Sequence, residues 1–151
     1  MLVQTKTQSQ TGAGNQKSFS ELGLSPGAVN LLERIGYEVP SPIQEAFIPL
    51  VLSGVDCTGQ ARTGTGKTAA FILPILEKID FDDPSTQALV LDPTRELSEQ
   101  VANEAIKLSE HHPCRTAVFV GGRPIRPQLN ELKRGVQIAV GTPGRIIDLL
   151  S

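Results

Sequence analysis

The sequence predicts an α/β fold, in which a parallel β-sheet carries helices on both faces. Two observations predict it. From residue 55 onward, short apolar runs alternate with helix-length segments, which is typical of parallel strands joined by helical crossovers. The first apolar run also leads into a glycine-rich turn followed by a helix, the setting of a phosphate-binding turn. With 151 residues, 39% of them hydrophobic, the chain is long enough to bury one core.

Residues 1–18 are predicted to be a disordered tail, and residues 19–151 to fold. The tail is mainly Gln, Thr, Ser, Gly and Lys, which bury too little apolar surface to offset the entropy of ordering. No apolar run reaches the roughly 18 residues of a membrane span, and the start lacks the apolar segment of a secretory signal. We therefore expect a cytoplasmic protein without membrane contact, and nothing indicates an oligomer.

Two helices are expected before residue 55. Each opens with a Ser-Pro pair, at residues 25–26 and 41–42, in which serine is the N-cap and proline the first helical residue. Gly36 and Gly54 are expected to end them. Their predicted apolar faces comprise Val29, Leu32 and Ile35 in the first helix, and Ile43, Phe47, Leu50 and Val51 in the second.

The remaining elements are expected to alternate in type. The strands are predicted at residues 55–58, 88–91, 116–120 and 136–140, and the first of them is expected to be buried. The helices are predicted at residues 67–79, 95–110, 124–134 and from 143 onward, with a kink at Pro74. The predicted inward positions are Leu97, Val101, Ala105 and Leu108 in the second of these helices, and Ile146, Ile147 and Leu150 in the last.

The glycine-rich turn lies in the segment VDCTGQARTGTGKT. Gly64 and Gly66 let the backbone turn its N–H groups inward, and the helix that begins near Lys67 adds its positive end. Lys67 is expected to reach the β- and γ-phosphates of a nucleotide, and the Thr68 hydroxyl to bind Mg²⁺, which makes these two the predicted catalytic residues. Kinases, GTPases, transporters and helicases all use such a turn. The predicted cofactor-binding residues here are Ala61, Arg62, Thr63, Gly64, Thr65, Gly66, Lys67 and Thr68.

Five segments together resemble one family. They are GYEVPSPIQ at 36–44, ARTGTGKT at 61–68, PTREL at 93–97, the glycine pair at 121–122 and TPGR at 142–145. In this order they resemble the Q motif and motifs I, Ia, GG and Ib of the DEAD-box ATP-dependent RNA helicases, whose motif I also has alanine at its first position. The resemblance covers residues 19–150. It implies a RecA-like P-loop NTPase domain that binds ATP and Mg²⁺.

Two residues before the turn are expected to bind the base. The Gln44 carboxamide can donate to and accept from one base edge, a pairing that suits N6 and N7 of adenine. Phe19, seventeen residues before Gly36, is expected to stack on the base. The plainer alternatives are an exposed helix residue for Gln44 and a core anchor for Phe19.

The last three motifs each follow a predicted strand. Because the carboxyl ends of parallel strands meet at one edge, these segments are expected to share a rim that binds a ligand. Their hydroxyl, backbone N–H and guanidinium groups suit sugar-phosphate contacts, which the resemblance implies are made to single-stranded or duplex RNA. For the arginines, surface salt bridges are the alternative. The predicted RNA-binding residues are Pro93, Thr94, Arg95, Gly121, Gly122, Thr142, Pro143, Gly144 and Arg145.

The family's acidic Asp-Glu-Ala-Asp motif does not occur in this sequence. The resemblance therefore implies a truncated first domain, whose longer relative carries a second RecA-like domain. We expect this chain to bind nucleotide without turning it over, because carboxylates that hold Mg²⁺ and position water are missing. Two alternatives remain at this point: a non-catalytic ATP- and RNA-binding fragment, or another P-loop enzyme such as a DNA helicase or a nucleotide kinase.

Overall fold

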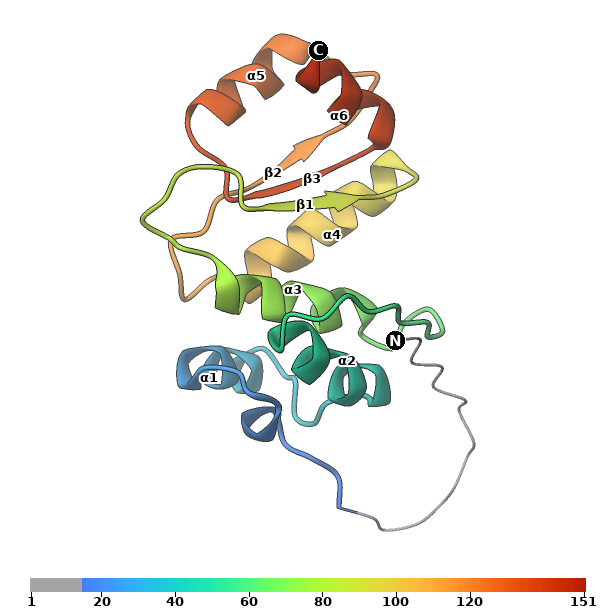
Figure 1. Ribbon diagram of the computed structural model, residues 1–151, viewed down its shortest axis with the longest axis vertical. Helices are drawn as coiled ribbons and strands as arrows, with labels where there is room; N and C mark the ends of the chain where they lie inside the picture. Colours follow the sequence, from blue (N-terminus) through green and yellow to red (C-terminus); the bar gives the residue numbers. More distant parts are fainter. Residues whose placement is uncertain (1–14) are drawn as a thin grey trace. The chain divides into compact units, whose positions relative to one another are not determined.

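The computed structural model describes residues 15–151, and the chain divides into two compact units between Lys78 and Ile79 (Figure 1). Most of the predicted tail lies outside the described residues, so its disorder and the boundary near residue 19 stay predictions. Among the helices of residues 15–151, none is both long and apolar enough to cross a membrane.

The secondary structure of the first unit, in its described part, consists of helices apart from an isolated bridge at Thr58. Helix α2 packs against α3, and the short 3-10 helix η1 contacts both α1 and α2. Each predicted Ser-Pro start is confirmed, since the cap hydroxyls of Ser25 and Ser41 accept hydrogen bonds from the N–H groups of Ala28 (3.3 Å) and Gln44 (3.5 Å). The elements span Phe19–Leu22 (η1), Pro26–Arg34 (α1), Pro42–Leu52 (α2) and Lys67–Lys78 (α3).

The predicted buried strand at residues 55–58 is wrong. Val55 is 49% exposed, Cys57 is half-buried, and Thr58 alone forms an isolated bridge. A strand needs a hydrogen-bonded neighbour for its backbone, and the described part of this unit contains no other strand. The apolar run therefore precedes the phosphate turn as irregular chain.

The second unit is built on a three-stranded parallel sheet of order β1-β3-β2. Ile138 lies opposite Ala88 and Thr116, and Gly141 lies opposite Leu91 and Phe119, so the strands end level with one another. All four residues of the central strand β3 are buried. The chain segments that follow the strands therefore begin at one edge of the sheet. The strands span Ala88–Leu91 (β1), Thr116–Phe119 (β2) and Ile138–Gly141 (β3).

Helices cover both faces of this sheet (Figure 1). Helix α4 contacts β2 and β3 on one face. On the other, Leu132 of α5 and Ile146 and Leu149 of α6 pack against a buried cluster of Phe119, Val136 and Ala139. The predicted α/β class with a parallel sheet and helices on both faces is thus confirmed. These helices span Arg95–Leu108 (α4), Ile125–Lys133 (α5) and Pro143–Leu150 (α6).

The buried faces of α4 and α6 differ from those predicted. Leu97 is 37% exposed and Ser98 is fully buried in its place, so that the buried positions of α4 keep spacings of three and four residues. In α6, Ile147 and Leu150 are 63% and 82% exposed, whereas Ile146 and Leu149, three apart, face the sheet. In both helices, which of two neighbouring residues is buried depends on the direction from which the helix approaches the sheet.

Candidate functional site

The glycine-rich turn has the backbone that the sequence predicts. Gly64 and Gly66 have φ angles of +79° and +80°, in the left-handed region that favours glycine. A Cβ atom at Gly66 would also overlap the Gln44 side-chain amide, so this position requires glycine for space as well. Helix α3 begins directly after it, at Lys67.

Side chains of the turn bond to its own carbonyl groups. Lys67 Nζ donates to Ala61 O (2.7 Å), and Thr65 Oγ1 donates to Arg62 O (2.6 Å). Both bonds join residues within six positions of each other, so they close the turn locally. The Lys67 ammonium group is thereby held over the loop, where a phosphate oxygen would replace the Ala61 carbonyl as its acceptor.

The turn fits a nucleoside triphosphate. The first N–H groups of α3 have no acceptor within the helix, and they add to the positive charge of Lys67. For Mg²⁺ the protein offers one ligand here, the Thr68 hydroxyl. Within residues 15–151 no cluster of three His, Cys, Asp or Glu side chains is placed to hold a metal ion. Phosphate oxygens and water would supply the remaining ligands of Mg²⁺.

Gln44 is buried and connects α2 to the turn. Its exposed fraction is 2%, so the alternative of an exposed helix residue is wrong. Its Oε1 accepts from Ser41 N–H (2.9 Å), and its Nε2 donates to Gly66 O (3.2 Å). One carboxamide therefore caps a helix and holds the phosphate turn at the same time.

Phe19 is a core residue in this structure. Its ring is 3% exposed and meets Tyr37 edge-on, with ring centroids 6.2 Å apart and planes at 71°. This geometry agrees with the alternative interpretation of Phe19 as a residue that anchors the core. Stacking of Phe19 on a base stays a prediction, and it requires the ring to gain exposed surface.

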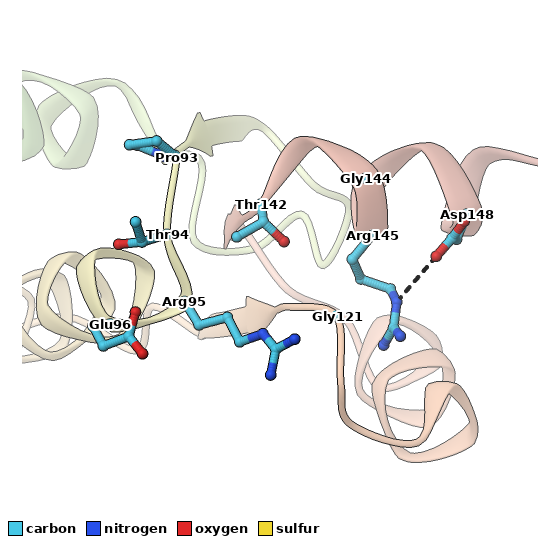
Figure 2. A pocket seen from close by; sticks show the side chains of 9 residues that line it. All are labelled: Pro93, Thr94, Arg95, Glu96, Gly121, Thr142, Gly144, Arg145 and Asp148. Atoms are coloured by element: carbon cyan, nitrogen blue, oxygen red, sulfur yellow. Dashed lines mark hydrogen bonds and ion pairs between the residues drawn. The ribbon is translucent and has the colours of Figure 1, made fainter.

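In the second unit, an open cavity of about 550 Å³ lies at the carboxyl edge of the sheet (Figure 2). We call it the rim cavity. The segments after β1, β2 and β3 all contribute to it, as the sequence predicts. Among the nine residues predicted to bind RNA, Gly122 and Pro143 do not line it. The lining residues are Pro93, Thr94, Arg95, Glu96, Gly121, Thr142, Gly144, Arg145 and Asp148.

Arg95 lies against the backbone of Gly122. Gly122 has a φ of +73°, and a Cβ atom there would overlap the Arg95 guanidinium group. Neither a hydrogen bond nor an ion pair joins Arg95 to the rest of residues 15–151. The guanidinium group therefore keeps its donors for a ligand, and Figure 2 shows it reaching toward Gly121.

Arg145, in contrast, is engaged within the protein. Its side chain is only 10% exposed. Its Nε lies 3.4 Å from Asp148 Oδ2, and its Nη1 donates to Arg123 O at 3.1 Å. The salt-bridge alternative thus holds for Arg145, although the arginine itself is nearly buried.

Two helices begin at the rim cavity and are capped differently. Thr94 Oγ1 accepts from Leu97 N–H (3.2 Å) at the start of α4. Thr142 occupies the corresponding position of α6, but its side chain makes no capping bond. The Thr142 hydroxyl and the first N–H groups of α6 therefore remain to bind an anion.

Sequence reasoning missed the two carboxylates of the rim cavity, Glu96 and Asp148. Asp148 had a signal, because it follows Arg145 by three residues on a helix and such pairs face each other. Glu96 had none.

Asp92 is a buried acid at the end of β1. It is 7% exposed, and its Oδ2 finds no hydrogen-bond partner among the residues described. Burial raises the pKa of this carboxyl, while a hydrogen bond with the Ser98 side chain partly opposes the rise. Asp92 does not line the rim cavity, so its effect is on the stability of the scaffold.

Comparison with known proteins identifies the family. The family model "DEAD/DEAH box helicase" matches residues 41–151. Two ATP-dependent RNA helicases named CshA, from Limosilactobacillus reuteri and Listeria monocytogenes, are each 52% identical over 130 residues, or 86% of this chain. The chain spans 26% and 25% of the length of these two relatives.

Solved structures of DEAD-box proteins are also similar to this chain. A DEAD box protein from Methanococcus jannaschii is 42% identical, with a TM-score of 0.82 over 87% of this chain and 36% of that one. S. cerevisiae Dbp5 bound to RNA and ADP BeF3 is 33% identical, with a TM-score of 0.76 over 89% of this chain and 34% of that one. The resemblance read from the five motifs is confirmed: the chain belongs to the DEAD/DEAH box helicase family.

Proposed function

We propose that this chain forms the ATP- and RNA-binding front part of an ATP-dependent RNA helicase. The observation that carries the proposal is the rim cavity, in which segments that follow three different strands present an arginine and a helix start to one space. The names of the CshA relatives support ATP and RNA as ligands. So does the state in which Dbp5 was solved, with RNA and ADP BeF3.

ATP binds at the phosphate turn. Lys67 exchanges its bond to Ala61 O for one to the β- and γ-phosphates, and the N–H groups at the start of α3 take the remaining oxygens. The Thr68 hydroxyl would hold Mg²⁺, which would offset negative charge on the phosphates. Gln44 reads the adenine edge, for which its carboxamide exchanges at least one of its present partners, Ser41 or Gly66.

RNA binds in the rim cavity through its sugar-phosphate backbone. Arg95 donates to one phosphate, and the Thr142 hydroxyl and the N–H groups at the start of α6 bind a neighbouring one. These groups contact no base edge, so the binding is insensitive to sequence. In the longer protein, closure of a second RecA-like domain on ATP and RNA bends one strand and breaks local base pairs.

The test compares Arg95→Ala with Arg126→Ala in the 151-residue chain. Arg126 is also an exposed arginine of the second unit, but it does not line the rim cavity. We expect Arg95→Ala to weaken binding of a labelled single-stranded RNA about tenfold, because a charged hydrogen bond is lost. The slope of log K against log salt is expected to fall by about 0.7, the value for one phosphate contact. Equal effects of the two variants would contradict the proposal.

Three further measurements separate the alternatives. Binding of a DNA oligonucleotide of the same sequence tests a DNA helicase, since the 2′-OH distinguishes the two ligands. Release of inorganic phosphate from ATP, measured with and without RNA, distinguishes an active ATPase from a non-catalytic fragment. A nucleotide kinase is not supported by the family. Location in the cytoplasm stays a prediction, which fractionation of cells expressing the tagged chain would test.

A further inference from the structure

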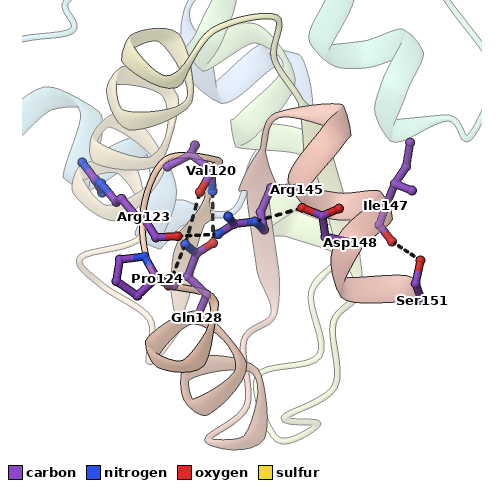
Figure 3. A network of polar contacts seen from close by, with 8 residues as sticks. All are labelled: Val120, Arg123, Pro124, Gln128, Arg145, Ile147, Asp148 and Ser151. Atoms are coloured by element: carbon purple, nitrogen blue, oxygen red, sulfur yellow. Dashed lines mark hydrogen bonds and ion pairs between the residues drawn. The ribbon is translucent and has the colours of Figure 1, made fainter.

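Gln128 of α5 holds the backbone that enters and leaves the glycine pair at 121–122 (Figure 3). Its side chain is buried, with the residue only 7% exposed. Its Oε1 accepts from Val120 N–H at 3.1 Å. Its Nε2 donates to Val120 O at 3.2 Å and to Pro124 O at 3.3 Å. One carboxamide thus satisfies backbone groups on both sides of the turn formed by residues 121–123, which we call the GG turn.

These hydrogen bonds matter because Val120 lies just beyond the end of an edge strand. Strand β2 ends at Phe119 and lies at an edge of the sheet, so within residues 15–151 Val120 has no further strand to pair with on its outer side. Gln128 offers Val120 a donor and an acceptor together, as the peptide group of a neighbouring strand would. Since Val120 is fully buried, no water replaces these bonds if the carboxamide is removed.

The GG turn is also held from its other side. Arg145 of α6 donates to Arg123 O at 3.1 Å, as Figure 3 shows. Between the two attachments lies Gly122, against whose backbone the Arg95 guanidinium group rests. The position of the GG turn therefore determines where Arg95 points.

We propose that Gln128 is a positioning residue for RNA binding, acting through the GG turn and Arg95 without touching the ligand. It does not line the rim cavity. The inference rests on the proposed binding of RNA there, but its first step, that Gln128 fixes the GG turn, holds independently of any ligand. A carboxamide is required because the position needs an acceptor and two donors at once.

The experiment uses Gln128→Met with Gln137→Met as its matched control. Methionine preserves the volume of glutamine and removes its hydrogen bonds. Gln137 is likewise buried, at 5% exposure, and likewise bonds to backbone, accepting from Arg115 N–H (2.9 Å) and donating to Asp83 O (3.2 Å). It precedes β3, at the edge of the sheet away from the rim cavity.

We expect Gln128→Met to raise the Kd for a labelled single-stranded RNA about five- to tenfold, since more than one bond that fixes the turn is lost. Gln137→Met is expected to change it less than about twofold, because its bonds lie outside the site. Binding is measured at a temperature where circular dichroism finds all three proteins folded. Equal Kd changes in the two variants, or none in Gln128→Met, would overturn the proposal.

A second readout does not depend on RNA. In Gln128→Met no side chain accepts from Val120 N–H, whereas Gln137→Met leaves that hydrogen bond intact. Amide hydrogen exchange at Val120 is therefore expected to accelerate in Gln128→Met and to stay slow in Gln137→Met. Slow exchange in both variants, or equally accelerated exchange in both, would refute the role of Gln128. If the wild-type chain bound no RNA while Val120 exchanged as expected, the proposed RNA function would fail and the hold on the GG turn would stand.

Discussion

The phosphate turn and the rim cavity are both suited to phosphate, but they are held in different ways. The phosphate turn closes on itself, with Lys67 and Thr65 donating to carbonyls a few residues away. The GG turn of the rim cavity is held by side chains of two other helices, Gln128 and Arg145. The phosphate turn therefore depends mainly on its own short segment, with one bond from another helix, Gln44 Nε2 to Gly66 O, whereas the rim cavity depends on the assembly of its whole unit.

The cationic side chains of the two sites, Lys67 and Arg95, also differ in how they are held. Lys67 has an acceptor in its own loop that a phosphate must replace. Arg95 rests on Gly122 and has no acceptor to give up within the described chain. Mutations should therefore affect the two sites independently.

The largest effect is expected from Lys67→Ala. Loss of a charged hydrogen bond to phosphate should weaken binding of a fluorescent ATP analogue about 30-fold or more, while RNA affinity stays within about twofold of wild type. Lys78→Ala is the control, because Lys78 lies on the same helix and also donates to a carbonyl, Val51 O at 2.8 Å. A parallel loss of RNA affinity in Lys67→Ala would show that the two sites are not independent.

An intermediate effect is expected from Gly122→Ala. A Cβ at a φ of +73° costs about 1–2 kcal/mol, and it displaces Arg95 from the turn. Urea unfolding should show that loss of stability, and RNA affinity should fall several-fold. Gly121→Ala serves as the stability control, since a Cβ at Gly121 has nothing within 4 Å and no positive φ. Comparable destabilisation by both substitutions would contradict this explanation.

The smallest effect, and one of opposite sign, is expected from Asp92→Asn. Because the pKa of Asp92 is raised in the folded state, stability falls as pH rises above its ordinary value of 3.8, where the unfolded chain releases the proton first. The substitution should therefore stabilise the chain by about 1 kcal/mol at pH 7, the size of one unpaired buried group. Below pH 3.8 the difference should disappear. Thermal unfolding of the variant and the wild type at pH 7 and at pH 3 measures the stability difference at each pH. A stability difference that did not depend on pH would exclude titration of Asp92 as its cause.

Local signals predicted most of the fold. Both Ser-Pro helix starts, the strand at Ala88–Leu91 and the glycine conformations of the phosphate turn follow from residues close together in the chain. The convergence of three segments on the rim cavity followed from the rule that parallel strands end at one edge.

The errors concern partners that lie far away in the sequence. Residues 55–58 have the composition of a strand, but pairing requires a neighbour that their unit does not contain. The sequence predicts that Gln44 binds a base edge, which stays a prediction, but only the folded structure places its carboxamide beside Gly66. Likewise, nothing in the spacing of Arg145 predicts that its guanidinium group reaches the Arg123 carbonyl.

Because β3 is the central strand, the segments around the rim cavity are expected to differ in mobility. Ile138–Gly141 is paired on both sides and buried throughout, whereas in the described chain β1 and β2 are each paired on one side only. Local unfolding starts where few contacts must break, so the edge strands fray before β3 does. The start of α6, which follows β3, therefore remains as a fixed reference. The segments carrying Arg95 and the GG turn can move relative to it without global unfolding.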